Sequence, residues 1–79
     1  MLIQYTGLKD INGIEIYEYD NIKTIDGDDL LCLFNNGAFY VYDYINNLEI
    51  SLLSEYIVNN NIQTFGICKT YINNLKRGV

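Results

Sequence analysis

Residues 30–44 read LLCLFNNGAFYVYDY, two apolar runs on either side of Asn36-Gly37. An Asn-Gly pair favours a two-residue type I′ turn, because both central residues of that turn need a positive φ. The segment therefore predicts a β-hairpin with strands over residues 30–34 and 39–44. A two-residue loop also fixes the register of the two strands. The predicted pairs are Phe34 with Phe39 and Cys32 with Val41 on one face, and Leu33 with Tyr40 and Leu31 with Tyr42 on the other.

Both faces of this hairpin are apolar, so it is either central in a closed barrel or half covered by a partner. Runs of β-branched and aromatic residues predict further strands. These strands are expected over residues 1–5, 14–19, 20–25 and 62–68. Helical turns are expected over residues 51–57 and 70–76, the second with Thr70 as its N-cap and Gly78 beyond its end. We predict a mainly β fold, a small SH3-like barrel of five or six short antiparallel strands with one or two short helical turns, in a single domain over residues 1–79.

The segment before the first long β pattern is expected to be a connection over residues 6–13. It ends in Asn12-Gly13, a second turn signal. A two-residue hairpin there would place Asp10 opposite Glu15, and like charges that face each other across strands are destabilising. We therefore expect a looser connection at this point.

The composition limits the function. The chain has 79 residues, is 49% hydrophobic and has ten acidic against five basic residues, for a net charge of −5. The apolar content argues for a folded chain, and no apolar run approaches the roughly 20 residues that span a membrane. The first four residues show no signal peptide. An acidic chain repels phosphate backbones, so we expect no direct nucleic-acid binding and no membrane contact.

Catalytic constellations are missing from the sequence. The chain has no histidine, which excludes Ser-His-Asp and Cys-His arrangements, and it has no Gly-rich phosphate loop. Asp26-Gly27-Asp28-Asp29 lacks the alternating ligands and distal Glu of a calcium loop, so an exposed acidic turn is expected. Cys32 and Cys68 are expected to be free thiols that act as small hydrophobes. We expect no enzyme activity, no catalytic residue, no metal and no cofactor.

Residues 4–20 read QYTGLKDINGIEIYEYD. This segment resembles the signature Q-Y-T-G-L-K-D-x-N-G-x-E-I-Y-E-G-D of the YopX-like phage and prophage proteins, with Tyr19 where the family has Gly. A weaker similarity covers residues 65–74, FGICKTYINN, and the family's I-G-N-I-Y-E-N ending. The chain thus looks like the C-terminal module of that family. The resemblance implies a mainly β module of phage or prophage origin, and with it the cytoplasm of a bacterial host.

Two kinds of side chain are candidates for a binding surface. Tyr40, Tyr42 and Tyr44 alternate along one predicted strand, and Tyr17 and Tyr19 along another, so each set forms either a half-buried wall or an exposed aromatic platform. Acidic side chains form two groups that are expected at the surface, the first with Glu15, Glu18 and Asp20 and the second with Asp26, Asp28 and Asp29. The predicted protein-binding residues are Glu15, Glu18, Tyr19, Asp20, Asp26, Asp28, Asp29, Tyr40, Tyr42 and Tyr44.

These features favour a non-catalytic module that binds a protein. Its sharper form is an anti-defence inhibitor, similar to an anti-CRISPR protein, whose carboxylates imitate nucleic acid in the basic channel of a host protein. The alternative is a homodimeric structural or assembly module of a phage that pairs through its tyrosine face and has no host target. Simple solubility is a further explanation of the acidity. A single-stranded nucleic-acid binder that stacks bases on the tyrosines is disfavoured by the charge.

Overall fold

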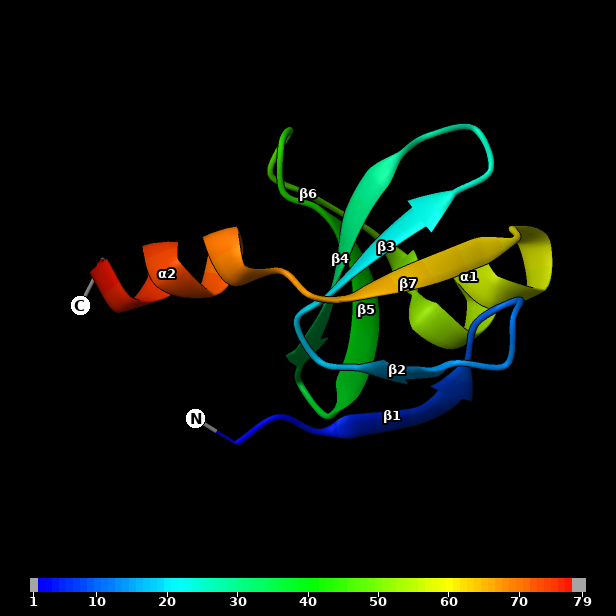
Figure 1. The fold of residues 1–79 in the computed structure, drawn as a ribbon, viewed down its shortest axis with the longest axis horizontal. Coiled ribbons are helices and arrows are strands. Elements are labelled where there is room, and N and C mark those ends of the chain that lie inside the picture. The colour runs from blue at the N-terminus through cyan, green and yellow to red at the C-terminus, as the bar shows by residue number, and fades with distance from the viewer. Residues whose placement is uncertain (1, 78–79) are drawn as a thin grey trace.

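Within residues 2–77, which the computed structural model describes, the chain forms seven strands and two helices. They follow the order β1 Tyr5–Lys9, β2 Glu15–Tyr17, β3 Asp20–Thr24, β4 Asp29–Asn35, β5 Ala38–Asp43, β6 Leu48–Leu52, α1 Leu53–Asn59, β7 Ile62–Ile67 and α2 Lys69–Arg77. Strands β1 and β2 form a two-stranded sheet, and the other strands form a five-stranded sheet in the order β6-β5-β4-β3-β7. All strand pairs are antiparallel. The mainly β prediction is confirmed (Figure 1).

The central hairpin forms as the sequence predicts. Its register pairs Phe34 with Phe39, Leu33 with Tyr40, Cys32 with Val41 and Leu31 with Tyr42. Asn36 and Gly37 have φ angles of 50° and 82°, the positive values that a type I′ turn requires. Both strands extend one residue beyond the predicted ends at the turn, to Asn35 and Ala38. Local turn chemistry is therefore sufficient to specify this part of the sheet.

The barrel is not closed by hydrogen bonds. The β1–β2 hairpin packs along β7, but the two sheets stay separate, so no ladder joins β2 to β7. In Figure 1 this hairpin crosses the lower side of the molecule beneath β7. The helix α1 lies between the ends of β6 and β7, whereas α2 extends away from the sheets. The seam between β2 and β7 becomes a groove, as described below.

Several predicted boundaries are wrong near the N-terminus. The first strand covers Tyr5–Lys9 and not residues 1–5, so much of the expected connection is strand. The looser connection at Asn12-Gly13 is confirmed, because Lys9 and not Asp10 lies opposite Glu15. The strand expected over residues 14–19 ends at Tyr17, where the chain turns into β3. The expected strand start at Met1 lies outside the described residues.

The C-terminal elements follow the prediction more closely. The helical turn expected over residues 51–57 is the helix Leu53–Asn59, and residues 48–52 before it are strand. Strand β7 ends at Ile67, close to the expected residue 68. Helix α2 begins at Lys69, so Thr70 lies in its first turn and is not its N-cap. Gly78, expected beyond the helix, lies outside the described residues.

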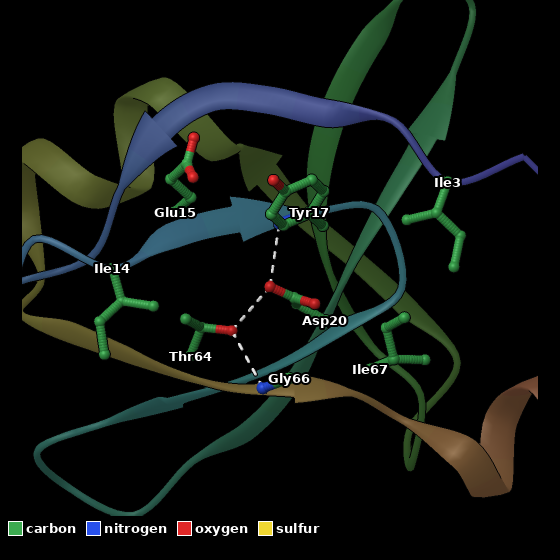
Figure 2. A pocket seen from close by; sticks show the side chains of 8 residues that line it. All are labelled: Ile3, Ile14, Glu15, Tyr17, Asp20, Thr64, Gly66 and Ile67. Atoms are coloured by element: carbon green, nitrogen blue, oxygen red, sulfur yellow. Dashed lines mark hydrogen bonds between the residues drawn. The ribbon is translucent and has the colours of Figure 1, made fainter.

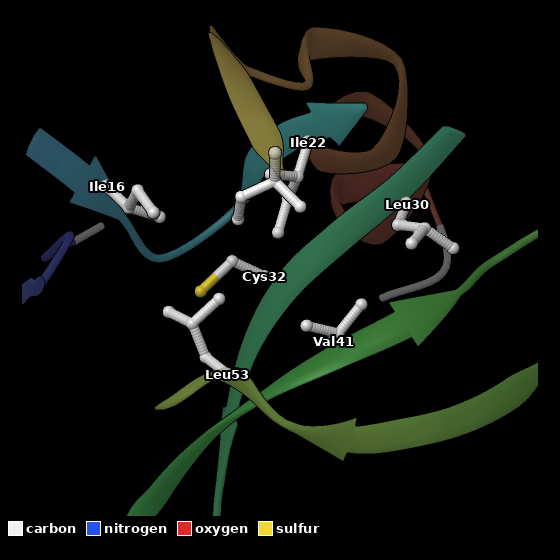
Figure 3. Packing of buried hydrophobic residues seen from close by; sticks show 7 residues of the cluster. Ile16, Ile22, Leu30, Cys32, Val41 and Leu53 are labelled. Carbon is white, nitrogen blue, oxygen red and sulfur yellow. The ribbon is translucent and has the colours of Figure 1, made fainter. Parts of the chain in front are cut away.

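The hydrophobic core lies between the inner face of the large sheet, the β1–β2 hairpin and α1 (Figure 3). Its buried members are Ile16, Ile22, Leu30, Cys32, Val41, Leu53 and Ile62. Each such aliphatic side chain stabilises the fold by about 1.5–3 kcal/mol relative to an exposed one. Leu31 is equally buried but is not part of this cluster, which is consistent with the opposite face of β4. Both cysteines are free thiols, and burial raises the pKa of Cys32 to about 12.

Candidate protein-binding surface

The turns β3–β4 and β5–β6 enclose a hollow of about 330 Å³ with acidic and apolar walls. Its lining includes Asp28, Asp29, Asp43, Ile45 and Ile50, which we call the acidic loop face. Ile45 and Ile50 are 71% and 43% exposed. The face therefore presents three carboxylates beside an apolar surface that no described residue covers.

Two carboxylates of the acidic loop face are fixed in place. Asp29 is half-buried and accepts hydrogen bonds from the hydroxyl of Tyr44, at 2.9 Å, and from the side-chain amide of Asn21. Burial and, after it, the bond to Asp29 raise the pKa of Tyr44 to about 12. The side-chain amide and backbone N–H of Asn46 donate to Asp43 at 2.8 and 3.1 Å and lower the pKa of Asp43. Preordered carboxylates lose less side-chain entropy when they bind a partner.

Sequence reasoning found part of this face. It singled out Asp28, Asp29 and Tyr44, which the structure brings together. It missed Asp43 and the two isoleucines, although Ile45 stands before Asn46-Asn47, a pair typical of turns. Asp26 is exposed, as expected, but does not line the hollow.

The three alternating tyrosines form a half-buried wall. Tyr40 and Tyr42 lie in β5, and Tyr44 follows the end of that strand. All three are partly exposed, and the hydroxyl of Tyr42 donates to the side chain of Asn47. The expected common face for Tyr17 and Tyr19 is wrong, because the chain turns between them. Their rings pack on different neighbours, Tyr17 on Tyr5 at 5.3 Å and Tyr19 on Tyr71 at 6.2 Å between centroids.

The loop between β1 and β2 is organised by the carboxylate of Asp10. This side chain is 7% exposed, and one oxygen accepts the backbone N–H groups of Asn12 and Ile14 at 2.8 and 2.9 Å. Its other oxygen accepts the N–H of Thr64 in β7 at 2.9 Å. Asp10 therefore shapes its own loop and also ties the small sheet to the large one.

Asp20 makes a second link to the same threonine. It is 3% exposed, so its expected place at the surface is wrong. Its Oδ2 accepts the N–H of Tyr17 at 2.9 Å and the hydroxyl of Thr64 at 2.8 Å (Figure 2). The N–H of Tyr17 faces away from β1, because Glu18 and not Tyr17 donates to the chain on that side, and it therefore needs another acceptor. The carboxylate supplies it.

Tyr19 occupies the turn between these elements with a φ of 70°. Its N–H donates to the carbonyl of Cys32 at 2.7 Å, and its own carbonyl accepts from the N–H of Cys68 at 2.8 Å. Positive φ is costly for a residue with a side chain and easy for glycine. Tyr19 thus adopts a backbone conformation that favours glycine, and two backbone hydrogen bonds hold it there.

The sequence of the chain matches a known protein family. The family model described as YopX protein matches residues 1–70. The chain belongs to the YopX family. Part of Reverse gyrase 1 of Sulfurisphaera tokodaii is also similar, with 35% identity over an alignment of 63 residues that covers 77% of this chain. The chain spans 5% of that protein's length. No solved structure matches the chain.

In this YopX protein the signature residues build the fold. Asp10 and Asp20 accept backbone hydrogen bonds, and Ile16 between them is fully buried. Of the two predicted acidic groups, Glu15 and Asp20 line the groove beside β7, whereas Asp28 and Asp29 line the acidic loop face. The structure therefore places these groups on separate hollows.

Among the described residues of the YopX protein, no group of three or more His, Cys, Asp or Glu side chains is arranged to hold a metal ion. None of the helices within that same range is long and apolar enough to cross a membrane.

Proposed function

We propose that this YopX protein is a phage-type, non-catalytic module that binds a basic protein of a bacterial host through its acidic loop face. The observation that carries the proposal is the hollow that Asp28, Asp29 and Asp43 line together with the exposed Ile45 and Ile50. An apolar centre with a polar rim is the usual anatomy of a protein interface. Charge on the rim steers a basic partner and selects it.

The distribution of charge supports an anti-defence form of this function. Three of the five basic residues lie at positions 69–77, so residues 1–68 carry ten acidic side chains against two lysines. Asp10 and Asp20 are buried, so eight acidic side chains against two lysines remain for the surface of residues 1–68. Such a surface is complementary to a channel that binds nucleic-acid phosphates. In this proposal the protein acts in the cytoplasm of the host, occupies such a channel as an anti-CRISPR protein would, and does not bind nucleic acid itself.

The test is affinity capture from a bacterial lysate that contains CRISPR effectors, with mass-spectrometric readout. The variant Asp28→Asn with Ile45→Ser removes a charge and an exposed apolar side chain from the acidic loop face. The matched control is Glu55→Gln with Val58→Ser on α1, where both positions are also exposed. We expect the control to capture a basic protein as the natural chain does, at low salt and not at high salt. Capture that the loop-face variant leaves unchanged would refute the proposal.

A second candidate is a homodimeric assembly module with no host target. It is supported by β6, an outer strand of the five-stranded sheet whose Leu48 is 59% exposed. A strand edge with exposed apolar side chains readily pairs with another chain. Light scattering at low micromolar concentration should then give twice the monomer mass, and Leu48→Lys should abolish the dimer. A strict monomer would remove this candidate.

A further inference from the structure

A second hollow lies on another side of the molecule, along the seam where β2 and β7 meet without a ladder. It measures about 510 Å³, within the range of natural binding clefts. Ile14, Tyr17 and Ile67 line it and are 53%, 37% and 40% exposed, and Ile3 adds a further apolar wall. Figure 2 shows these side chains around the end of β2 and the edge of β7. The seam therefore leaves an open apolar groove in place of a closed barrel wall.

An acidic group stands at the bottom of this groove. Asp20 is 97% buried, and its Oδ2 receives both of its hydrogen bonds, from Tyr17 and Thr64. In the described part of the chain, no side-chain oxygen is sealed from solvent without a partner. The other oxygen, Oδ1, has no hydrogen-bond partner there and points away from these two donors in Figure 2. It therefore opens into the groove as an acceptor whose position is fixed.

No positive charge among the described residues that line the groove compensates this carboxylate. Glu15 also lines the groove, and none of the lining residues is basic. A carboxylate in such a place attracts a donor with positive charge, and bonds of this kind are roughly twice as strong as neutral ones. The apolar walls at the same time favour aliphatic groups on either side of that donor.

We propose that this groove binds an arginine or lysine side chain presented by an extended segment of a partner protein, with apolar residues two positions before and after it. In an extended chain such residues share one face and lie about 6–7 Å apart. The basic side chain reaches Oδ1 of Asp20, and its neighbours contact Ile14 and Ile67. This site is separate from the acidic loop face and specifies the partner by a short motif.

The probe is an acetylated and amidated pentapeptide, Val-Thr-Arg-Thr-Val, titrated into the ¹⁵N-labelled protein and followed by NMR. We expect saturable shifts of the amides of Tyr17, Thr64 and Ile67. Replacing the arginine of the peptide by glutamine should weaken binding at least about threefold, and replacing it by glutamate should weaken it further. Equal affinity for all three peptides, or shifts that map to another surface, would overturn the proposal.

Two variants of exposed residues test the protein side without disturbing the core. Ile67→Ser removes an apolar wall and Glu15→Gln removes a charge, and each should weaken the arginine peptide by about two- to fivefold. Ile45→Ser on the acidic loop face is the matched control and should bind the peptide normally. Unchanged binding in both groove variants would contradict the proposal. Because the peptide assay needs no lysate partner, a failure of the acidic loop face in the capture experiment is read out separately.

Discussion

The protein contains two acidic regions of similar chemistry and opposite role. In residues 10–20, Asp10 and Asp20 are 7% and 3% exposed and accept hydrogen bonds from the backbone. In the turn between β3 and β4, Asp26 and Asp28 are exposed to solvent. A net charge of −5 therefore overstates the negative surface that a partner meets. The first region uses these two carboxylates to hold the fold, whereas Asp26 and Asp28 of the second remain exposed to solvent.

The largest effect should come from Asp10→Ala. This change leaves the N–H groups of Asn12, Ile14 and Thr64 without their acceptor and frees the small sheet from β7. We expect the free energy of unfolding to fall by about 3 kcal/mol, since bonds to a charged group are worth about 1.5–3 kcal/mol each and are not additive. Urea unfolding followed by circular dichroism measures the change.

The matched control for that variant is Asp26→Ala in the exposed turn. It should change the free energy of unfolding by less than about 0.5 kcal/mol. Equal stability of the two alanine variants would show that Asp10 does not stabilise the fold more than the exposed Asp26 does.

Thr64→Val tests the common partner of the two buried aspartates. Valine keeps the shape of the side chain and the backbone N–H that binds Asp10, but it removes the hydroxyl that donates to Asp20 at 2.8 Å. A carboxylate oxygen that loses one of two donors near the core should lower the free energy of unfolding by about 1–2 kcal/mol. A thermal melt is sufficient, because 1 kcal/mol shifts the Tm of a domain of this size by about 4–8 °C.

The contacts of Asp10 and Asp20 with Thr64 also show which parts of the fold the sequence could predict. The hairpin at Asn36-Gly37 depends on residues that are neighbours in the chain, so its turn and register were predicted in full. Asp10 and Asp20 also have local partners, but their common partner Thr64 lies 54 and 44 residues away. Their burial depends on this distant contact, which the neighbouring residues do not indicate.

The candidate surfaces show the same limit. Asp28, Asp29 and Tyr44 were predicted as binding residues, but their meeting with Asp43 and two isoleucines depends on how two separate turns approach each other. The groove beside β7 exists because the two sheets are not joined by hydrogen bonds, and no pattern in the sequence predicts that separation.

The buried region should also show itself at high pH. Burial, followed by the charges of Asp20 and Glu18, raises the pKa of Cys32 from 9.0 to about 12. The unfolded chain therefore releases this proton first. The contribution of the thiol to stability is complete below pH about 9 and is lost as the pH rises toward about 12. By pH 10 the free energy of unfolding should have fallen by about 1 kcal/mol. Urea unfolding at pH 8 and pH 10 measures it, and Cys32→Val, which cannot ionise, should show a smaller loss.

Tyr19 gives a finer test of how the first region is held. Its φ of 70° is tolerated worst by β-branched residues and best by glycine. Tyr19→Val should therefore be less stable than Tyr19→Gly by about 1 kcal/mol, although valine has the higher strand propensity. Thermal melts of the two variants decide the order. A more stable valine variant would mean that the turn adopts another backbone path.

The charges of the exposed turn should change the pKa of a nearby tyrosine but not the free energy of unfolding. Burial, followed by the charges of Asp28 and Asp26, raises the pKa of Tyr56. Asp26→Asn with Asp28→Asn should therefore lower the pKa of Tyr56 and leave the free energy of unfolding within about 0.5 kcal/mol. Carbon-13 NMR of labelled tyrosine resolves this ring from the others during a pH titration, and Tyr5, which is affected by Glu15 and not by the turn, is the internal reference. A loss of stability without a change in the pKa of Tyr56 would mean that the turn acts through contacts, as the buried aspartates do.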